Sequence, residues 1–380
     1  TEVELSKDDW YGDGSADTFY IGTAAELVDF SIKASTNSFA GKTICLTASI
    51  DMTNYKDYLP SGYPTWVPIG STSYDFRGAF DGRGKTISNL AFDNGSSAHA
   101  GFFGYVNGAE IKDFTLSHIS VAGGQYVGAV ASYARGNAST FSDITVESGE
   151  VKSSGAANGR AGGILGYAYV DGVQIENCVN KANVSGVYYI GGIVGYSYYN
   201  NLEITACANY GSVTSTNGSS STNGTGGILG YAYNKTIISE CTNEGAVTGA
   251  GNYVGGIAGY FDQGSITDCS NEGDIGGTYQ VGGIVGTNTT YGPLLLTRCK
   301  NDGAVKGNMS GTTESYGVGG IIGTAYYASS IIRESISTGS VSGSVRAMGG
   351  ITGSVSTNGV TIKDCYNTAY VTNGYTSGYT

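Results

Sequence analysis

The feature that most constrains this chain is a five-residue phrase, Gly-Gly-Ile-x-Gly, that occurs seven times at intervals of 27 to 37 residues. A motif with such a period marks a repeat architecture, in which each unit buries its apolar side against its neighbours. The sequence therefore predicts one elongated body rather than several globular domains. The copies begin at Gly162, Gly191, Gly226, Gly255, Gly282, Gly319 and Gly349.

Each turn of the repeat reads as three short segments. The motif is followed by Ile-x-x-Cys-x-Asn, as at 175–180, and then by a short strand after a tight bend, as at 244–247. Two degenerate turns at Gly101 and Gly128 bring the number of turns to nine. Three short strands per turn without a 3.6-residue period predict an all-β fold, a right-handed parallel β-helix over residues 96–380.

Equivalent residues of successive coils stack about 4.8 Å apart in such a fold. We expect the motif isoleucines to form an inward aliphatic ladder, and the asparagines an amide ladder in which each side chain bonds to the next coil. Six of the seven cysteines share one repeat position, which predicts reduced thiols packed in the core. One turn departs from the pattern, with Ser335 and Ser337 in place of Cys and Asn.

Residues 1–95 lack the repeat and are expected to form an N-terminal capping region with the first coils. Thr23-Ala-Ala-Glu26 is a capping box, so one short helix should begin at Ala24. A solenoid must cover its open end, which explains the helix there. The C-terminal end has no such cover, and we expect further domains after it. Longer repeats gain residues at 153–160, 214–225 and 306–317, which should project from one edge.

The segment Gly191-Gly-Ile-Val-Gly-Tyr196, with a following Ile-x-x-Cys-x-Asn-x-Gly-x-Val, resembles the GLUG motif of bacterial surface proteins, found in immunoglobulin A peptidases and adhesin-like proteins. The stretch 76–90 is similar to the entry segment that commonly precedes such repeats. The motif's third position is Ile where Leu is usual. The resemblance implies an extracellular or cell-surface location and a non-catalytic role, since any peptidase activity of that family lies in separate domains.

Composition excludes several classes of function. The net charge is −12 and charged residues are only 13% of the chain, so phosphate backbones and anionic lipids would be repelled. We expect no nucleic-acid partner and no direct membrane insertion. The two histidines, His99 and His118, lack metal-ligand spacing, and no hydrolase motif is present. The sequence therefore predicts a protein that is not an enzyme and needs no cofactor.

An alternative is a carbohydrate-active β-helix enzyme, a polysaccharide lyase or glycoside hydrolase, because such folds can cluster acids on one face. Glu244, Glu272 and Asp302 occupy the same position after the asparagine in three consecutive coils. Stacked carboxylates repel one another unless they are solvated or bridged by Ca²⁺. A solvated acidic edge is the simpler interpretation, and a weak calcium site is the second.

Tyrosine is unusually abundant, at 30 residues. One column follows the motif in four consecutive coils, and a second stands two residues further on. If the isoleucines point inward, strand alternation turns these columns outward. Structural stacking is one interpretation, and a binding face for a host or bacterial surface glycan or protein is the other. The columns are Tyr167, Tyr196, Tyr231 and Tyr260, and Tyr169, Tyr198 and Tyr233. We read the chain as an adhesin-like binding face or spacer of a larger surface protein.

Overall fold

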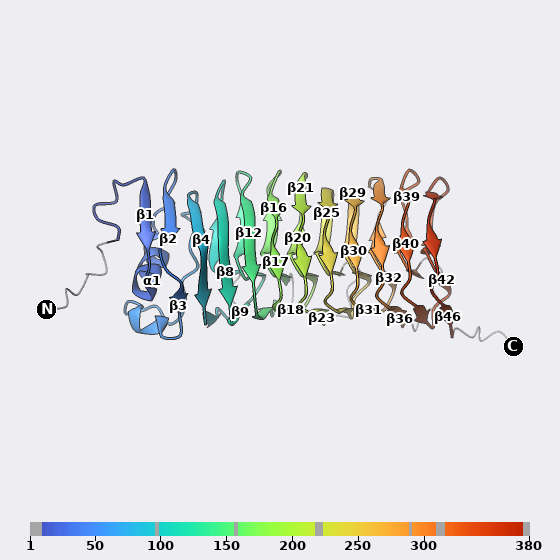
Figure 1. Ribbon diagram of the computed structural model, residues 1–380, viewed down its shortest axis with the longest axis horizontal. Helices are drawn as coiled ribbons and strands as arrows, with labels where there is room; N and C mark the ends of the chain where they lie inside the picture. Colours follow the sequence, from blue (N-terminus) through green and yellow to red (C-terminus); the bar gives the residue numbers. More distant parts are fainter. Residues whose placement is uncertain are drawn as a thin grey trace.

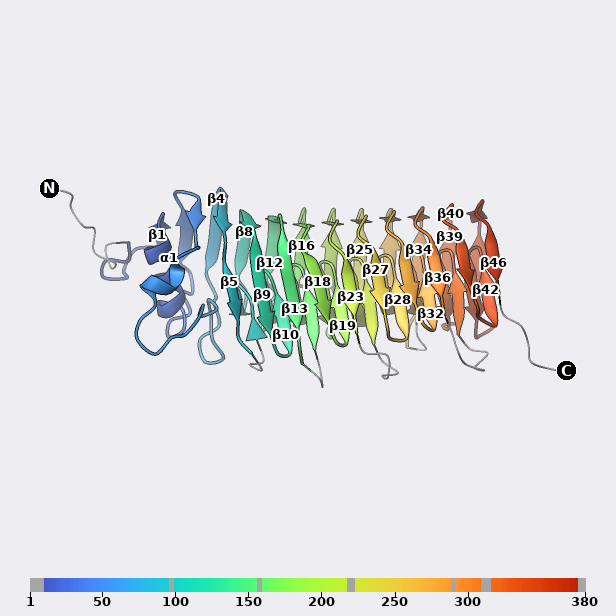
Figure 2. The same ribbon diagram turned by 90° about the horizontal axis from the view of Figure 1, so that it is seen from below.

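The computed structural model describes residues 10–95, 99–155, 159–216, 223–288, 291–308 and 316–374. The protein is an elongated right-handed parallel β-helix with its two ends at opposite tips of the body (Figure 1). The predicted all-β fold is confirmed. Figure 2 shows the same coils from below, stacked side by side along the long axis. Parts of all three predicted insertions, 156–158, 217–222 and 309–315, lie outside the described residues.

Three parallel sheets, here called A, B and C, form the body; sheet A begins at residue 18, and sheets B and C begin at residues 91 and 99. Sheet C carries the approach to the glycine motif: β6 (His99–Ala100), β10 (Tyr126–Gly128), β14 (Arg160–Gly162), β19 (Tyr189–Gly191), β24 (Gly224–Gly226), β28 (Tyr253–Gly255), β32 (Gln280–Gly282), β37 (Gly317–Gly319) and β42 (Ala347–Gly349). Sheet B closes each turn: β5 (Ala91–Asp93), β9 (Ile119–Gly123), β13 (Gly149–Ser153), β18 (Asn183–Gly186), β23 (Val213–Ser215), β27 (Val247–Gly249), β31 (Ile275–Gly277), β36 (Val305–Gly307), β41 (Val341–Gly343) and β46 (Val371–Asn373).

Sheet A is the widest and contains both the segment after the motif and the Ile-x-x-Cys-x-Asn segment. Its strands from the first coils are β1 (Thr18–Ile21), β2 (Thr43–Leu46), β3 (Ile50–Asp51), β4 (Ala79–Ser88), β7 (Phe103–Val106), β8 (Glu110–Ser117), β11 (Ala131–Arg135) and β12 (Thr140–Val146). Those from the later coils are β15 (Leu165–Tyr169), β16 (Gln174–Glu176), β17 (Val179–Asn180), β20 (Val194–Ser197), β21 (Leu202–Thr205), β22 (Ala208–Asn209), β25 (Leu229–Ser239), β26 (Thr242–Asn243), β29 (Ala258–Thr267), β30 (Ser270–Asn271), β33 (Val285–Asn288), β34 (Leu294–Thr297), β35 (Lys300–Asn301), β38 (Ile322–Ala325), β39 (Ile331–Arg333), β40 (Ile336–Ser337), β43 (Thr352–Val355), β44 (Thr361–Lys363) and β45 (Tyr366–Asn367).

The glycine pair of the motif forms the corner between sheets C and A. A Cβ atom on Gly162 would lie 2.1 Å from the carbonyl oxygen of Leu165, and one on Gly163 would lie 2.2 Å from the carbonyl oxygen of Gly192 in the next coil. Such distances are far inside van der Waals contact, so only glycine lets the chain turn this tightly against the neighbouring coil. The motif that defines the repeat is therefore a packing requirement of the corner.

The isoleucine that follows the glycines points into the core, as predicted. Six of the seven motif isoleucines are fully buried, and Ile351 in the last complete coil is half-buried. A second inward position follows from a feature that sequence reasoning did not predict. The residue before each repeat cysteine, and before Ser335 in the turn that lacks one, adopts a left-handed conformation. Its φ lies between 50° and 56° at Asn177, Ala206, Glu240, Asp268, Arg298, Glu334 and Asp364. This interruption of strand alternation lets Ile175 and Cys178, three residues apart, both face inward.

The predicted amide ladder is confirmed from Asn180 to Asn301, and Ser337 interrupts it before Asn367. The Nδ2 atom of Asn209 donates to the Oδ1 atom of Asn243 at 2.8 Å, and the Nδ2 atom of Asn243 donates to the Oδ1 atom of Asn271 at 2.7 Å. Each Nδ2 atom also donates to the carbonyl oxygen two residues later, such as Gly245 at 2.8 Å. The ladder therefore joins successive coils and holds the bend between sheets A and B.

The seven cysteines are free thiols, six of them buried and Cys365 half-buried. Each repeat cysteine donates its Sγ–H group to backbone carbonyls, as Cys241 does to Ser239 at 3.2 Å and to Ile204 at 3.5 Å. The thiols thus act as small core side chains with a weak polar contact.

The N-terminal end is covered by α1 (Ala24–Lys33), which begins where the capping box predicted. The Thr23 hydroxyl accepts from the backbone N–H of Glu26, and the Glu26 carboxylate accepts from that of Thr23. Phe30 of α1 packs edge-on against Phe39 and Phe76, with centroids 5.1 and 6.0 Å apart. A short 3₁₀ helix, η1 (Tyr55–Tyr58), lies beside α1. These aromatic contacts close the first coil against water.

Candidate functional site: a tyrosine-lined outer face

A column of stacked tyrosines lies outside the main core, along the junction of sheets A and C. Its members pair in register between neighbouring strands and form a cluster separate from the aliphatic core. The ring centroids of successive members are 5.0, 5.2 and 3.9 Å apart. We call this set the tyrosine ladder: Tyr167, Tyr196, Tyr231 and Tyr260.

The ladder turns away from the aliphatic core, as alternation predicted, but its rings are not available as a contact surface. Their exposed fractions are only 6 to 8%. The physical reason is that sheet C presents its own side chains to the same junction, and Tyr126, Tyr189 and Tyr253 pack over the ladder. The prediction that Tyr167, Tyr196, Tyr231 and Tyr260 contact a partner is therefore corrected: these rings hold the two sheets together.

The second predicted column remains accessible. Tyr169 is 37% exposed, and Tyr198 and Tyr233 are half-buried. The rings of Tyr198 and Tyr233 are parallel, with centroids 5.1 Å apart, and Tyr169 lies 5.5 Å from Tyr198. We call Tyr169, Tyr198 and Tyr233 the rim tyrosines. The sequence predicted an outward surface for both tyrosine columns, and in the structure only the rim tyrosines provide it.

Arg160 of β14 inserts a positive charge among the rings. Its guanidinium carbon lies 4.5 Å from the ring centroid of Tyr167 and 4.7 Å from that of Tyr196, and it also contacts the rings of Tyr126 and Tyr189. A guanidinium over several aromatic faces is stabilised by the ring quadrupoles. Burial raises the pKa of Tyr167 and of Tyr196, although Arg160 opposes the shift. Their hydroxyls therefore stay protonated.

His99 occupies the N-terminal end of the same face. Its ring lies 4.3 Å from that of Tyr105 and 4.9 Å from that of Tyr126, and its Nε2 atom hydrogen-bonds to the Tyr105 hydroxyl. Burial, helped by the nearby positive charge of Arg135, lowers the pKa of His99 to about 4. Sequence reasoning assigned no role to this residue, whereas the structure makes it a neutral member of the aromatic cluster.

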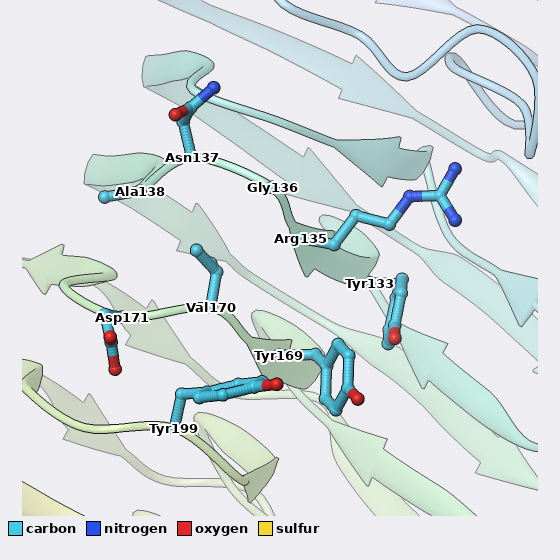
Figure 3. A pocket seen from close by; sticks show the side chains of 9 residues that line it. All are labelled: Tyr133, Arg135, Gly136, Asn137, Ala138, Tyr169, Val170, Asp171 and Tyr199. Carbon is cyan, nitrogen blue, oxygen red and sulfur yellow. The ribbon is translucent and has the colours of Figure 1, made fainter.

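An open cavity of about 610 Å³ lies beside the rim (Figure 3). Its wall combines the rings of Tyr133, Tyr169 and Tyr199 with Asn137 and Asp171. Most of the polar groups already have partners: the Asp171 carboxylate accepts from the backbone N–H of Asn200 at 2.7 Å, and Asn137 donates to Asn107 at 3.0 Å.

The arginine that lines this cavity is also committed to a neighbour. Arg135 binds the carboxylate of Asp75 through two nitrogens, at 2.7 and 2.9 Å, and lies 4.4 Å from the ring of Tyr105. The cavity therefore offers aromatic faces, an amide and one carboxylate rather than an unpaired cation.

The three stacked acids do not form a metal site. Glu244 and Glu272 are exposed, whereas Asp302 is bound by Lys300 at 2.7 Å and accepts a hydrogen bond from Thr338. Burial opposes ionisation of Asp302, but the bonds from Lys300 and Thr338 outweigh it and lower its pKa. Among the described residues no group of three or more His, Cys, Asp or Glu could hold a metal ion. The calcium hypothesis is corrected, because Asp302 is already paired with Lys300 and the two glutamates stay exposed to solvent.

Sequence reasoning missed the residues that sheet C contributes to this face. They stand two positions before the first glycine of the motif, or at the equivalent place in the degenerate turns. Comparing the residue types at that position in successive turns would have identified them. The position carries large side chains in most coils but varies in chemistry, which hid the pattern. We call these the facing residues: His99, Tyr126, Arg160, Tyr189, Tyr253 and Gln280.

In the part of the chain that the structure describes, no helix is long and apolar enough to cross a membrane.

A family model described as the GLUG motif matches residues 250–276, which confirms the predicted resemblance at that repeat. A 173-residue segment is 32% identical to Halomucin of Haloquadratum walsbyi and covers 44% of this chain but only 2% of that protein. A crystal structure from Bacteroides ovatus, which carries the name of an immunoglobulin A1 protease, aligns with a TM-score of 0.53 and 22% identity over 68% of this chain and 76% of that one. That likeness concerns the fold alone.

Proposed function

We propose that this β-helix is a non-catalytic repeat module of an exported or surface-attached protein, and that its rim tyrosines bind neutral glycans. The GLUG repeat and the similarity to a short part of Halomucin support a module that forms one part of a larger surface protein. The β-helix also acts as a rigid spacer, because the amide and aliphatic ladders tie successive repeat coils together.

The observation that carries the binding proposal is the row of rim tyrosines. Tyr169, Tyr198 and Tyr233 are spaced by the coil repeat, with centroids 5.1 to 5.5 Å apart, and remain partly open to solvent. Their rings already pack on one another and against the buried ladder, so little side-chain entropy is lost on binding. Tyrosine combines an apolar face with a hydroxyl, which matches the mixed apolar and polar surface of a sugar ring.

Charge favours a neutral ligand over an acidic one. The net charge of −12 repels polyanions at long range. Close to the rim, Arg135 is paired with Asp75, and Arg160 is held among the tyrosine rings. Neither arginine is positioned as an open anion-binding group.

The same surroundings disfavour the alternative of a carbohydrate-active enzyme. Most glycoside hydrolases use a pair of carboxyl groups on either side of the scissile bond. The cavity beside the rim is lined by one carboxylate, Asp171, and that group accepts a hydrogen bond from the backbone of Asn200. Binding without turnover is therefore the function that the geometry supports best.

The test is binding to a panel of immobilised neutral and acidic polysaccharides, with the same panel assayed for product release. Tyr198→Ala and Tyr233→Ala should each weaken binding about tenfold, since loss of one stacked ring costs about 1–1.5 kcal/mol. Tyr210→Ala is the matched control, because Tyr210 is 45% exposed but lies at the corner between sheets A and B. Equal binding by all three variants would contradict the proposal, and release of oligosaccharide would favour the enzyme.

A further inference from the structure

The tyrosine ladder stops after Tyr260, and a hollow opens where the next ring would stand. In the pairing of β29 with β33, the residue opposite Tyr260 is Thr287. On the facing side, Tyr253 is followed by Gln280. The hollow measures about 220 Å³ and is lined by these four residues together with Tyr326 and others. Its position and size suit one ring-shaped group in line with the ladder.

The amide of Gln280 gives this hollow an unsatisfied polar group. The side chain is 1% exposed, and its Nε2 atom donates to the hydroxyl of Tyr326 at 3.2 Å. Its Oε1 atom is buried and has no hydrogen-bond partner within the described chain. Exchanging the two ends of the amide would only move the deficit to the nitrogen atom. A buried amide atom without a partner is costly, and a ligand hydroxyl would satisfy it.

Thr287 and Asn288, two other polar side chains of the lining, are already engaged. The Thr287 hydroxyl donates to the carbonyl oxygens of Asn288 and Thr324, at 2.9 and 3.1 Å. The amide of Asn288 donates to Ser330 at 2.9 Å and accepts from the backbone N–H of Tyr326 at 2.8 Å. These contacts fix the shape of the hollow, and among its described lining residues the Oε1 atom of Gln280 is the buried side-chain atom that lacks a partner.

The chemistry of the lining indicates a neutral ligand. The described side chains around the hollow are tyrosines, amides and a threonine, without a formal charge. Burial raises the pKa of Tyr253 to about 12, so its hydroxyl is a neutral donor at physiological pH. Pockets for drug-sized ligands hold about 300–1,000 Å³, so a hollow of this size suits a single ring rather than a chain.

We propose that this hollow is a subsite for one neutral pyranose unit. Its C–H face stacks on the ring of Tyr260, in the place of the absent next tyrosine, and one of its hydroxyls donates to the Oε1 atom of Gln280. This inference rests on the proposed glycan binding and adds a specific position for one sugar residue. The rim tyrosines, on the same face of the β-helix, then bind other sugar units of neutral glycans.

The experiment measures pyranoside binding by saturation-transfer NMR and by titration. The ligands are methyl glucopyranoside, methyl galactopyranoside, methyl mannopyranoside and methyl N-acetylglucosaminide. Thr287→Tyr extends the ladder into the hollow and should abolish binding of every pyranoside that the unmodified protein binds. Gln280→Leu keeps the side-chain volume but removes the amide, and should weaken binding about tenfold, the loss of one hydrogen bond. Gln174→Leu, at an exposed position of β16, is the matched control and should bind as the unmodified protein does.

The outcomes separate this inference from the proposed function. Pyranoside binding that is unchanged in both hollow variants overturns the subsite. If the unmodified protein binds polysaccharide through Tyr198 but binds none of the pyranosides, the hollow holds only water and the subsite is wrong while the rim stands. If pyranosides bind in the hollow but Tyr198→Ala leaves polysaccharide binding intact, the rim is wrong. Circular dichroism and melting curves verify folding, and Gln280→Leu decides the question if Thr287→Tyr does not fold.

Discussion

Replacing one asparagine of the amide ladder should destabilise the β-helix far more than replacing an exposed asparagine that also bridges two coils. Asn243 is fully buried and takes part in three hydrogen bonds, to Asn209, Asn271 and the carbonyl of Gly245, all between 2.7 and 2.8 Å. Asn243→Ala removes all three bonds, and one donor and two acceptors lose these partners in a region closed to water.

The expected cost follows from those three groups. A buried polar atom that loses its partner costs about 1–3 kcal/mol, and a water that enters the new space recovers part of this. We therefore expect Asn243→Ala to lower the free energy of unfolding by about 3–5 kcal/mol. Asn183 is the matched control, since its exposed carboxamide accepts from the backbone and hydroxyl of Ser212 in the next coil. Water replaces those bonds, so Asn183→Ala should cost less than about 1 kcal/mol.

Urea unfolding followed by circular dichroism gives the free energies, and hydrogen exchange read by mass spectrometry shows where protection is lost. Solenoids are held by nearest-neighbour contacts, so the loss should centre on the coils that contain β26 and β30. Equal destabilisation by the two variants, or loss of protection spread evenly over all coils, would refute the reasoning that the ladder joins neighbouring coils.

Three further expectations concern side chains of the core and the aromatic face. Tyr231→Ala should cost about 3–5 kcal/mol in thermal or urea unfolding, because it opens a cavity in the packed ladder, whereas Tyr198→Ala at the rim should cost much less. Thiol titration in denaturant without reductant should return close to seven thiols per chain; three would show two disulfides. The folded-state pKa of His99 is lowered to about 4, so the unfolded chain binds more protons between about pH 4 and 6.5 and stability should fall as pH drops through that window. His99→Gln should flatten that part of the stability profile.

The inward part of the structure could be predicted from the sequence because stacking in register makes each core position repeat. The motif isoleucines, the cysteines and the asparagines recur at fixed places, and burial of these columns follows directly from the coil spacing. The helix at Ala24 was predictable for a different reason, since a capping box is a local signal that needs no tertiary partner.

The outward face could not be predicted to the same depth. Strand alternation says only that Tyr231 leaves the core, and it carries no information on what sheet C places above that ring. Burial of Tyr231 depends on Tyr189 and on Tyr260, which lie 5.0 and 3.9 Å away across the sheet junction and in the next coil. Likewise, the left-handed residue before each cysteine has no single residue type, since Asn177, Ala206 and Arg298 all adopt it. Its role appears only when the inward spacing of Ile and Cys is known.

The two faces of the coil are under different physical constraints, and this locates the specific chemistry of the molecule. An inward position must match its neighbours above and below, because a change leaves a cavity or an unpaired amide. An outward position can change without that cost when solvent or a ligand replaces the lost contact. The change from Tyr260 to Thr287, together with that from Tyr253 to Gln280, falls between two coils whose core isoleucines are both fully buried. The aromatic column therefore ends without any break in the core, and the unsatisfied Oε1 atom of Gln280 marks the proposed sugar subsite at that end.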